Sequence, residues 1–379
     1  MIRKITNQAL PYAWGSRTLI SDYLAIEATG DPMAEIWFGT HSGSLARDLE
    51  DPSKTLLDLR NAKPLSFLLK ILAADSPLSI QAHPTRAQAV EGFERENRAG
   101  IALTAAHRNY RDPGHKPEMI VALSEFEALC GFRTVQYVRE LLEDIQGYPA
   151  AEDLKAAAAE WQNLLDDSLR PLFSHLLNSR ESFGVLSVAL AALANFDSRF
   201  ELCLRLNEMY PGDPGVFIAL MMNHVHLQPG QALYLPAGNI HAYLSGLGVE
   251  IMAASDNVLR GGLTPKHIDV VELEAIVDFE PTTIEFVKQI EVAAGLVEFQ
   301  TEADDFILYR VEPSAQRVLA DLQLGEDAVI LCTAGEVAVS NSLGERTVLQ
   351  RGEAAYSSKD ARLTTFAGSG TAFVAIGKG

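Results

Sequence analysis

The pattern of hydrophobic and polar positions changes twice along the chain. Residues 1–130 carry short apolar segments separated by Gly and Pro, with strand-like examples at 64–72, 78–83 and 119–123. From about residue 135 to 209, apolar residues recur at helical spacing within segments rich in Ala, Leu and Glu. The run Pro211-Gly212-Asp213-Pro214-Gly215 ends this block, because Pro and Gly interrupt regular structure. The pattern predicts a helical block between regions of β-structure.

Strand-like patterning returns after the helical block, at 216–220, 231–235 and 248–253. A further unit of alternating segments begins near residue 283 and includes 328–332, 336–340 and 371–376. We therefore expect a mainly β protein with an α insert. Its first β domain would comprise 1–134 and 212–282, interrupted by a helical domain at 135–211, and a second β domain would comprise 283–379.

Length and charge narrow the possible functions. A chain of 379 residues is long enough for two or three domains. Its formal net charge of −19 disfavours binding to nucleic acid or to an anionic membrane, although a few local cations could still hold a small phosphorylated molecule. The three widely spaced cysteines favour a reducing compartment. With no apolar run near the roughly 18 residues of a membrane span, and a polar N-terminus, we expect a cytoplasmic protein.

The most specific motif lies between Gly230 and His241. It has the form G-x5-P-x-G-x2-H, with Pro236 and Gly238 at the intermediate fixed positions. Residues 231–235 alternate as a strand, and the Pro-Ala-Gly turn leads His241 onto the next strand. The spacing resembles the second metal-binding motif of cupins, which are jelly-roll proteins. An ordinary hairpin carrying a core histidine is the alternative interpretation.

Two further segments place polar side chains on strand faces. In Pro77-Leu78-Ser79-Ile80-Gln81-Ala82-His83-Pro84, the side chains of Ser79, Gln81 and His83 share one face and apolar side chains share the other. In His115-Lys116-Pro117-Glu118, Glu118 opens an apolar strand, where a buried carboxylate requires a cation nearby. Solvent exposure of these faces is the alternative in both cases.

Together, Gln81, His83, Glu118 and His241 supply two imidazoles, a carboxylate and an amide oxygen. This mixture of nitrogen and hard oxygen ligands, without a thiolate, suits a zinc ion that keeps room for water or substrate. Ligand type alone also permits iron or manganese.

Charged groups near these segments are candidates for proton transfer or anion binding. Lys70 interrupts an apolar run, so it either extends to the surface or projects into a polar cavity. Glu250, Asp256, Arg260 and Lys266 follow the His241 strand, in a region that is either a charged surface loop or part of the site. The pair Gly261-Gly262 would let backbone approach a ligand closely.

These segments resemble type I mannose-6-phosphate isomerases, which are cupin proteins. The matching stretches are 7–16 with Tyr12-Ala13-Trp14-Gly15-Ser16, Ala34-Glu35-Ile36-Trp37-Phe38-Gly39-Thr40-His41, 64–84, 109–118, and 234–273 with Ser255-Asp256-Asn257-Val258-Leu259-Arg260. Phe38 departs from the Met that many members carry, a change between apolar side chains of similar volume. The helical insert and the last β unit match in pattern rather than in residues.

The resemblance implies a fold, a reaction and roles for particular residues. It implies two cupin domains, the first holding one zinc ion per chain through Gln81, His83, Glu118 and His241. It implies interconversion of mannose 6-phosphate and fructose 6-phosphate through a cis-enediol. Arg260 would be catalytic, and the substrate-binding residues would be Trp14, Ser79, Lys116, Tyr243 and Lys266.

The proton-transfer base stays open between several groups. The reaction requires a base with a pKa near neutrality and a cation that stabilises the enediolate. Lys70, Lys116, His115, Glu250 and Asp256 are all chemically able to serve. An iron-dependent cupin oxygenase and a non-catalytic sugar-phosphate sensor are the alternative functions, and we expect a monomer whose partner is a small sugar phosphate.

The last β unit contains a second, incomplete copy of the cupin motif. It begins at Gly352, but Ser358 stands at the Pro position and Leu363 at the His position. We therefore expect this unit to be structural and to bind no metal.

Overall fold

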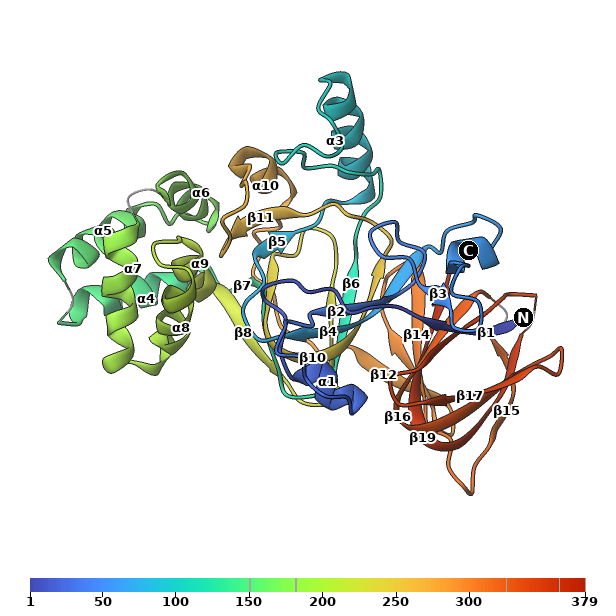
Figure 1. Ribbon diagram of the computed structural model, residues 1–379. Helices are drawn as coiled ribbons and strands as arrows, with labels where there is room; N and C mark the ends of the chain where they lie inside the picture. The colour runs from blue at the N-terminus through green and yellow to red at the C-terminus, as the bar shows by residue number, and fades with distance from the viewer. Residues whose placement is uncertain (150, 181–182, 325, 361, 379) are drawn as a thin grey trace.

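The computed structural model describes residues 1–149, 151–180, 183–324, 326–360 and 362–378 (Figure 1). It confirms a mainly β architecture with a helical insert. In Figure 1 the helical block lies at the left, a central β unit follows, and the C-terminal β unit lies at the right.

The bounds of the strands and of the helices, including the 3-10 helices η2 and η3, are as follows. The strands are β1 (Ile2–Thr6), β2 (Glu35–Phe38), β3 (Arg47–Asp48), β4 (Phe67–Ala74), β5 (Ile80–Ala82), β6 (Glu118–Ala122), β7 (Phe126–Phe132), β8 (Met222–Leu227), β9 (Ala232–Leu235), β10 (His241–Ala253), β11 (Leu259–Gly262), β12 (Lys288–Ala293), β13 (Leu296–Gln300), β14 (Phe306–Val311), β15 (Leu319–Leu324), β16 (Ala328–Asn341), β17 (Arg346–Gln350), β18 (Ala354–Ser357) and β19 (Leu363–Gly377). The helices are α1 (Leu19–Leu24), α2 (Leu56–Leu59), α3 (Arg86–Arg98), α4 (Val135–Gly147), α5 (Glu152–Asn163), α6 (Arg170–Asn178), α7 (Gly184–Ala192), η2 (Leu193–Asn195), η3 (Ser198–Phe200), α8 (Glu201–Met209), α9 (Gly215–Met221) and α10 (Val270–Ile276).

Strand β10 organises the central β unit. It pairs with β4 and β6 along its C-terminal half and with β5 and β7 near its N-terminal end. Its side chains are almost all buried, which agrees with a strand covered on both faces. Because all these neighbours meet on one strand, residues far apart in sequence come into register there.

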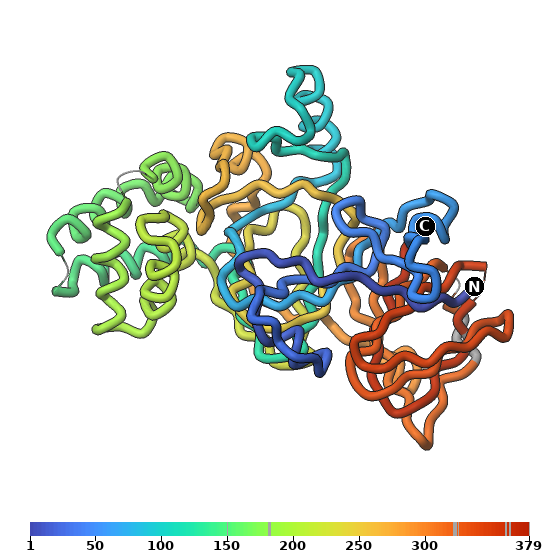
Figure 2. Tube along the Cα trace, in the orientation of Figure 1, coloured from blue at the N-terminus to red at the C-terminus, as the bar shows by residue number. Residues whose placement is uncertain are grey.

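The C-terminal sheet follows the order β12-β13-β14-β19-β16-β18-β1-β3. Strand β1 therefore pairs with β18, although the sequence pattern assigned residues 1–134 to the first β domain. Figure 2 shows the blue N-terminal segment running into the red C-terminal unit, with both termini on that side. The two β units also share an apolar core, in which Phe67 of β4 and Phe373 of β19 are both buried. The last unit thus supports the first through packing and through main-chain pairing.

Helix α4 begins at Val135, and the run of helices that it opens continues through α9. The strand predicted at 216–220 is wrong, because these residues form α9. Every residue of α9 is buried, and Phe217 packs against Trp161 with ring centroids 4.6 Å apart. A short apolar run buried on all sides has no amphipathic period, so its pattern does not distinguish a helix from a strand.

Helix α3 was also missed, in the region interpreted as short strands. Thr85 begins it with a capping box, in which the Thr85 side chain accepts from Gln88 N and the Gln88 side chain accepts from Thr85 N. The Thr-x-x-Gln spacing is a sequence signal for this helix start.

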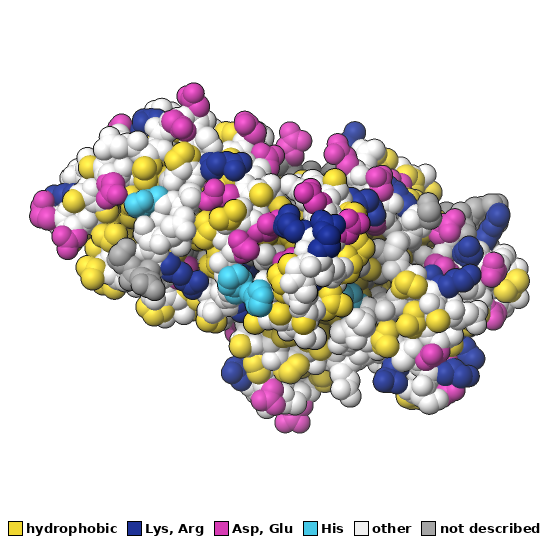
Figure 3. Space-filling view, turned by 90° about the horizontal axis from the view of Figure 1, so that it is seen from above, with side chains coloured by type: hydrophobic (Ala, Val, Ile, Leu, Met, Phe, Trp, Pro, Cys, Tyr) yellow, Lys and Arg dark blue, Asp and Glu magenta, His cyan; other side chains and the backbone are white. Residues whose placement is uncertain are grey.

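Surface charge and helix length bear on possible partners. On the face seen in Figure 3, Lys and Arg side chains stand in small groups among Asp and Glu side chains rather than in a continuous basic surface. No helix formed by the described residues is both long enough and apolar enough to cross a bilayer.

We expect Leu363→Ala to destabilise the protein without impairing its chemistry. Leu363 is fully buried in the apolar core of the C-terminal unit, where a cavity would cost roughly 2–5 kcal/mol in the free energy of unfolding. Urea unfolding would measure this loss, and the activity of the folded fraction should stay near wild type. Leu343→Ala is the matched control, since Leu343 is 63% exposed and should change stability by less than about 0.5 kcal/mol. A folded Leu363→Ala protein without turnover would contradict a purely structural role.

Candidate active site

A cavity of about 720 Å³ opens between the central β unit and the end of the helical insert. Such a volume suits a small ligand. Its lining includes many of the sequence-predicted residues: Trp14, Lys70, Ser79, Gln81, Lys116, Glu118, Tyr243, Glu250, Asp256, Arg260 and Lys266. Met209 and Tyr210 also line it, and the Tyr210 hydroxyl donates to the Pro77 carbonyl at 2.8 Å. The insert therefore supplies part of the wall.

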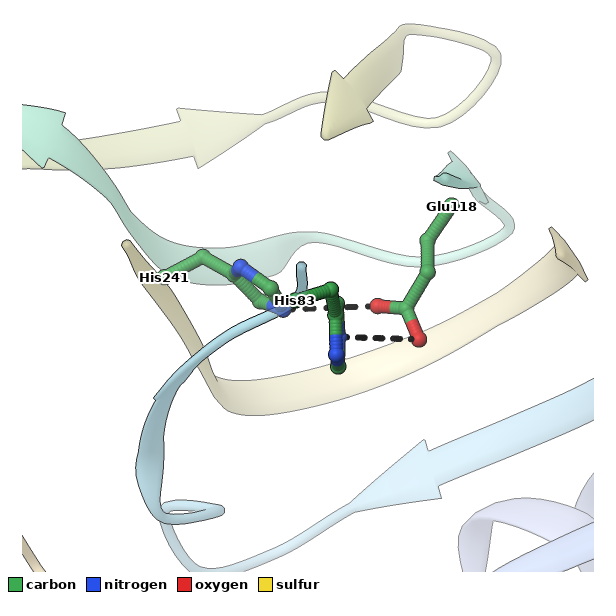
Figure 4. A group of neighbouring side chains, drawn as sticks. All are labelled: His83, Glu118 and His241. Atoms are coloured by element: carbon green, nitrogen blue, oxygen red, sulfur yellow. Dashed lines mark ion pairs between the residues drawn. The ribbon is translucent and has the colours of Figure 1, made fainter. Parts of the chain in front are cut away.

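Two imidazoles and a carboxylate, those of His83, His241 and Glu118, converge behind the cavity wall, and Glu118 itself lines the cavity (Figure 4). His83 Nε2 lies 3.4 Å from Glu118 Oε1, and His241 Nε2 lies 3.3 Å from Glu118 Oε2. All three side chains are buried. The Gln81 amide adds a fourth group, with its Nε2 3.3 Å from His241 Nε2.

Strand register explains this convergence. On β5, Gln81 stands opposite His241 of β10 on one side and opposite Arg260 of β11 on the other. Directly opposite residues in antiparallel strands have neighbouring side chains on the same face. Three strands thus place an imidazole, an amide and a guanidinium in one row.

The hydrogen bonds at Nδ1 of the two histidines leave both Nε2 atoms unprotonated, so each can bind a cation. His83 Nδ1 lies 2.7 Å from the Asn257 carbonyl, and His241 Nδ1 lies 3.0 Å from the Asn239 carbonyl. A carbonyl only accepts, so each Nδ1 carries the proton and each Nε2 presents a lone pair. Among the described residues, His83 Nε2 has no hydrogen-bond partner although it is buried. Two lone pairs facing a buried carboxylate fit a metal ion, and Gln81 can present its oxygen by turning its amide.

The protonation states agree with a cation site. Burial lowers the pKa of His83 to about 4, so its imidazole is neutral near pH 7. Burial by itself raises the pKa of Glu118, but the Lys116 ammonium is the largest of the influences that offset this and hold that pKa well below its ordinary value. Lys116 Nζ lies 2.7 Å from Glu118 Oε1. Glu118 is therefore a carboxylate that already attracts a cation.

A second polar group lies on the same cavity wall, around Lys70. Lys70 Nζ contacts Glu250 Oε2 at 2.8 Å and Glu35 Oε1 at 3.4 Å, and it lies 5.2 Å from the centroid of the Trp37 ring. Burial alone would lower the pKa of Lys70, yet Glu250 and Glu35 raise it above its ordinary value. The ammonium group is therefore charged, and it projects into the cavity rather than to the surface. Trp37, Lys70 and Glu250 are aligned across β2, β4 and β10.

The cavity lining also carries two cations, Arg260 and Lys266, that lack an acidic partner. Within the described part of the chain, no carboxylate lies within ion-pair distance of the Arg260 or Lys266 side chain. Burial and the neighbouring Arg111 lower the pKa of Arg260, while burial, Arg260 and Arg111 lower that of Lys266. Like charges held together and partly desolvated favour an anionic ligand.

Asp213 holds the loop that carries these cations. Its carboxylate accepts from the backbone amides of Leu263 at 3.0 Å and Thr264 at 3.3 Å, and it pairs with Arg180 at 2.9 Å. Gly262 has φ +142, and a Cβ there would lie 2.8 Å from Gly215 Cα. A side chain at Gly262 would therefore force the loop away from α9.

Asn257 fixes the segment that leads to Glu118. Its side-chain oxygen accepts from Arg111 N at 2.7 Å, and its side-chain nitrogen donates to the carbonyls of Asp112 at 2.7 Å and Gly114 at 2.8 Å. Its own carbonyl binds His83 Nδ1, so one residue connects two of the metal-ligating segments.

Two sequence-predicted groups lie at less central positions. His115 does not line the cavity: its Nε2 lies 2.6 Å from Asp305 Oδ2 of the C-terminal unit. Asp256 lines the cavity near its mouth and pairs with His41 at 3.3 Å. A hydrogen bond from His41 lowers the pKa of Asp256, so it is ionised near pH 7.

Several site residues were missed by the sequence analysis. Glu35, Trp37 and His41 line the cavity, and the conspicuous stretch 34–41 that contains them was a usable signal. Arg111 carried a similar signal, because it lies in the stretch 109–118 that leads to Glu118. Tyr210 had no local signal, since it ends a helix of the insert and reaches the cavity only through the fold.

Comparison with known proteins gives a consistent set of matches. A family model for the catalytic domain of type I phosphomannose isomerase matches residues 2–135. Mannose-6-phosphate isomerase of Salmonella typhimurium is 37% identical over 395 aligned residues, covering 97% of this chain and 98% of the relative. The human mannose-6-phosphate isomerase is 33% identical, covering 90% of this chain and 89% of its own.

Solved structures agree with these matches. A zinc-bound mannose 6-phosphate isomerase is 34% identical and superposes with a TM-score of 0.89, covering 100% of this chain and 99% of the other. The metal-free form of the Salmonella typhimurium enzyme gives a TM-score of 0.88 with the same identity and coverage.

Proposed function

The chain belongs to the type I phosphomannose isomerase family, and we propose that it interconverts mannose 6-phosphate and fructose 6-phosphate. The observation that carries this proposal is that one cavity is lined both by Glu118 of the His-Glu-His cluster and by cations that lack an acidic partner. A metal held by the His-Glu-His cluster would bind the reacting oxygens of a sugar. The cations would bind the anionic phosphate or stabilise an enediolate.

One zinc ion per chain is the proposed cofactor, held by Gln81, His83, Glu118 and His241. The two unprotonated Nε2 atoms and the ionised carboxylate support this ligand set. When bound, zinc supplies a Lewis acid that polarises the carbonyl and hydroxyl oxygens of the sugar.

The protein groups around this site would orient the sugar and move one proton between C2 and C1. Arg260 stands beside Gln81 and would stabilise negative charge that develops on the enediolate, because a guanidinium keeps its proton. Lys266, with Ser79 and Lys116, would bind the phosphate, while Trp14 and Tyr243 would contact the sugar.

Candidates for the proton-transfer base differ in their surroundings. Lys70 is held charged by two carboxylates, which suits it to orient Glu250 rather than to accept a proton. Burial raises the pKa of Glu250, an arrangement that moves a carboxylate toward the range useful for a base. Lys116 and Asp256 are the other candidates within the cavity lining, and the pairing of His115 with Asp305 argues against His115.

The alternative functions receive less support. An iron oxygenase of the cupin type usually uses more imidazoles, whereas this site offers two beside a carboxylate and an amide. A sugar-phosphate sensor would need no polar network of the kind built around Lys70 and Glu250. Zinc rather than iron in the purified protein, with no oxygen consumption, would exclude the oxygenase.

A coupled assay tests the proposed reaction. With mannose 6-phosphate as substrate, we expect fructose 6-phosphate to form, to stop forming after a chelator has removed the zinc, and to form again when zinc is restored. The expectation follows from the need for a Lewis acid at the His-Glu-His cluster. Unchanged turnover in protein shown by metal analysis to lack zinc would contradict the zinc-dependent mechanism.

We further propose that the chain acts as a monomer in the cytoplasm. The buried, free thiols of Cys130, Cys203 and Cys332 support a reducing compartment, since none forms a disulfide. Light scattering on the purified protein tests the oligomeric state, and a mass near twice 41.3 kDa would contradict a monomer.

A further inference from the structure

A second group of metal-ligating side chains lies on the outer edge of the central β unit. Glu127 of β7 and His224 and His226 of β8 each offer a ligand atom, and these atoms lie within 4.8 Å of one another. His224 Nε2 lies 2.5 Å from Glu127 Oε1, and the two imidazole centroids are 4.5 Å apart. None of the three residues lines the active-site cavity, and the proposed reaction does not use them.

Strand geometry places these side chains together without help from a loop. His224 and His226 are two residues apart on β8 and therefore point to the same face. Glu127 stands directly opposite His226 in the β7–β8 register, with His224 diagonal to it. Glu127 is nearly buried, His224 is partly buried and His226 is exposed, so the group is open to ions from solvent.

A protein cation already occupies the outer side of Glu127. Arg205 of α8 approaches both carboxylate oxygens, with Nη1 3.0 Å from Oε2 and Nη2 in close contact with Oε1. The Ser245 hydroxyl donates to Oε2 at 3.2 Å. Burial by itself raises the pKa of Glu127, but hydrogen bonds from His224 and Arg205 more than offset it, and the carboxylate stays ionised. The Arg205 side chain is 50% exposed, so it can leave toward solvent.

We propose that Glu127, His224 and His226 form a second divalent-cation site, for which Arg205 and the metal compete. Two imidazoles and one carboxylate on an exposed edge suit a borderline ion such as Zn²⁺, with water in the fourth position. Ligand atoms around such an ion lie roughly 3.4 Å apart, given bonds of about 2.0–2.1 Å in a tetrahedron. Rotation of the exposed His226 side chain closes the remaining gap. Because Arg205 belongs to the helical insert, binding of the ion would release one tie between the insert and the β unit.

Counting zinc in the zinc-loaded enzyme tests this site directly. Equilibrium dialysis over a series of free Zn²⁺ concentrations, followed by metal analysis, should find a range in which wild type holds one zinc more per chain than His226→Ala. The affinity of His226→Ala for the additional ion should fall by at least the roughly tenfold that loss of an outer-shell partner costs, since this variant loses a direct ligand. His226→Ala should keep its isomerase activity, because the residue is exposed and does not line the cavity. His175→Ala is the matched control: it removes another partly exposed imidazole, which lies beside a single carboxylate, Glu160.

Arg205→Ala tests the competition. Removing the competing guanidinium should tighten binding of the additional Zn²⁺ by about twofold to fivefold, the fold-change that corresponds to loss of one partly exposed charge pair. Unchanged or weaker binding in Arg205→Ala would overturn the competition. Equal zinc content in wild type and His226→Ala at every free Zn²⁺ concentration would overturn the site itself. Neither result depends on the metal bound at the catalytic cluster, because both compare proteins that retain it.

Discussion

Replacing His241 with alanine is expected to reduce bound zinc strongly and to leave negligible isomerase activity. His241 is fully buried, its Nδ1 is held by the Asn239 carbonyl, and its Nε2 faces Glu118 at 3.3 Å. The pairing of β10 with β5 fixes His241 beside Gln81. A neighbouring side chain therefore cannot easily take the place of the lost imidazole as a zinc ligand. Metal analysis of the purified variant and the coupled assay on mannose 6-phosphate measure the two effects.

Two companion variants separate loss of the metal from loss of the fold. His107→Ala removes an exposed imidazole from the same chain and should retain both zinc and activity. Glu118→Gln keeps the shape of the side chain and removes its charge, so it should also bind zinc more weakly without opening a cavity. Circular dichroism would show that each protein is folded. Full zinc occupancy in folded His241→Ala would disprove the assigned ligand set.

Arg260→Ala and Lys266→Ala are expected to affect different kinetic constants. If the Arg260 guanidinium meets charge that develops only in the enediolate, its loss should lower kcat by about 10²–10³-fold, with a smaller change in KM. Lys266 would bind the phosphate equally in the ground and transition states, so Lys266→Ala should mainly raise KM. The cavity geometry supports the split, because Arg260 stands beside Gln81 in the metal row whereas Lys266 lies further along the loop.

A control variant shows whether the effects of Arg260→Ala and Lys266→Ala come from their place in the cavity or from loss of any positive charge. Lys63→Ala removes an exposed lysine outside the cavity lining and should leave both constants near wild type. Zinc content should be unchanged in Arg260→Ala and Lys266→Ala. A change of less than threefold in kcat for Arg260→Ala would defeat the catalytic role, and a pure KM effect would reassign Arg260 to substrate binding.

Arg111 is a third cation near Arg260 and Lys266, and the sequence analysis did not single it out. It contributes to the depressed pKa values of both Arg260 and Lys266, and Asn257 holds its backbone. Three cations in one region strengthen the expectation of an anionic ligand at this end of the cavity.

The main architecture was predictable from local patterns because those patterns repeat over many residues. Alternation along the strands and 3.6-residue spacing in 135–209 predicted a β protein with a helical insert, and the structure agrees. The buried helix α9 and the capped helix α3 were missed for opposite reasons: α9 has no polar face, whereas α3 carried a capping signal that was overlooked.

The sequence by itself also determined which side chains were candidates for the site. Gln81 and His83 alternate on one strand face, and the Gly230–His241 spacing delivers an imidazole onto β10. These are local facts, because side-chain direction repeats every two residues along a strand. Apolar neighbours around Lys70 and Glu118 likewise marked them as charges that required partners.

Only the tertiary structure decided which of these groups meet. Pairing of β5 with both β10 and β11 aligns His241, Gln81 and Arg260, and a shift of one residue would turn Gln81 to the other face. The same folding sends His115 toward Asp305 of the C-terminal unit while its neighbour Lys116 faces the cavity. Strand β1 likewise pairs with β18 of the C-terminal sheet, a partner that lies far from it in the sequence. Which strands pair, and in which register, depends on burial of apolar surface from the whole chain, which no local pattern contains.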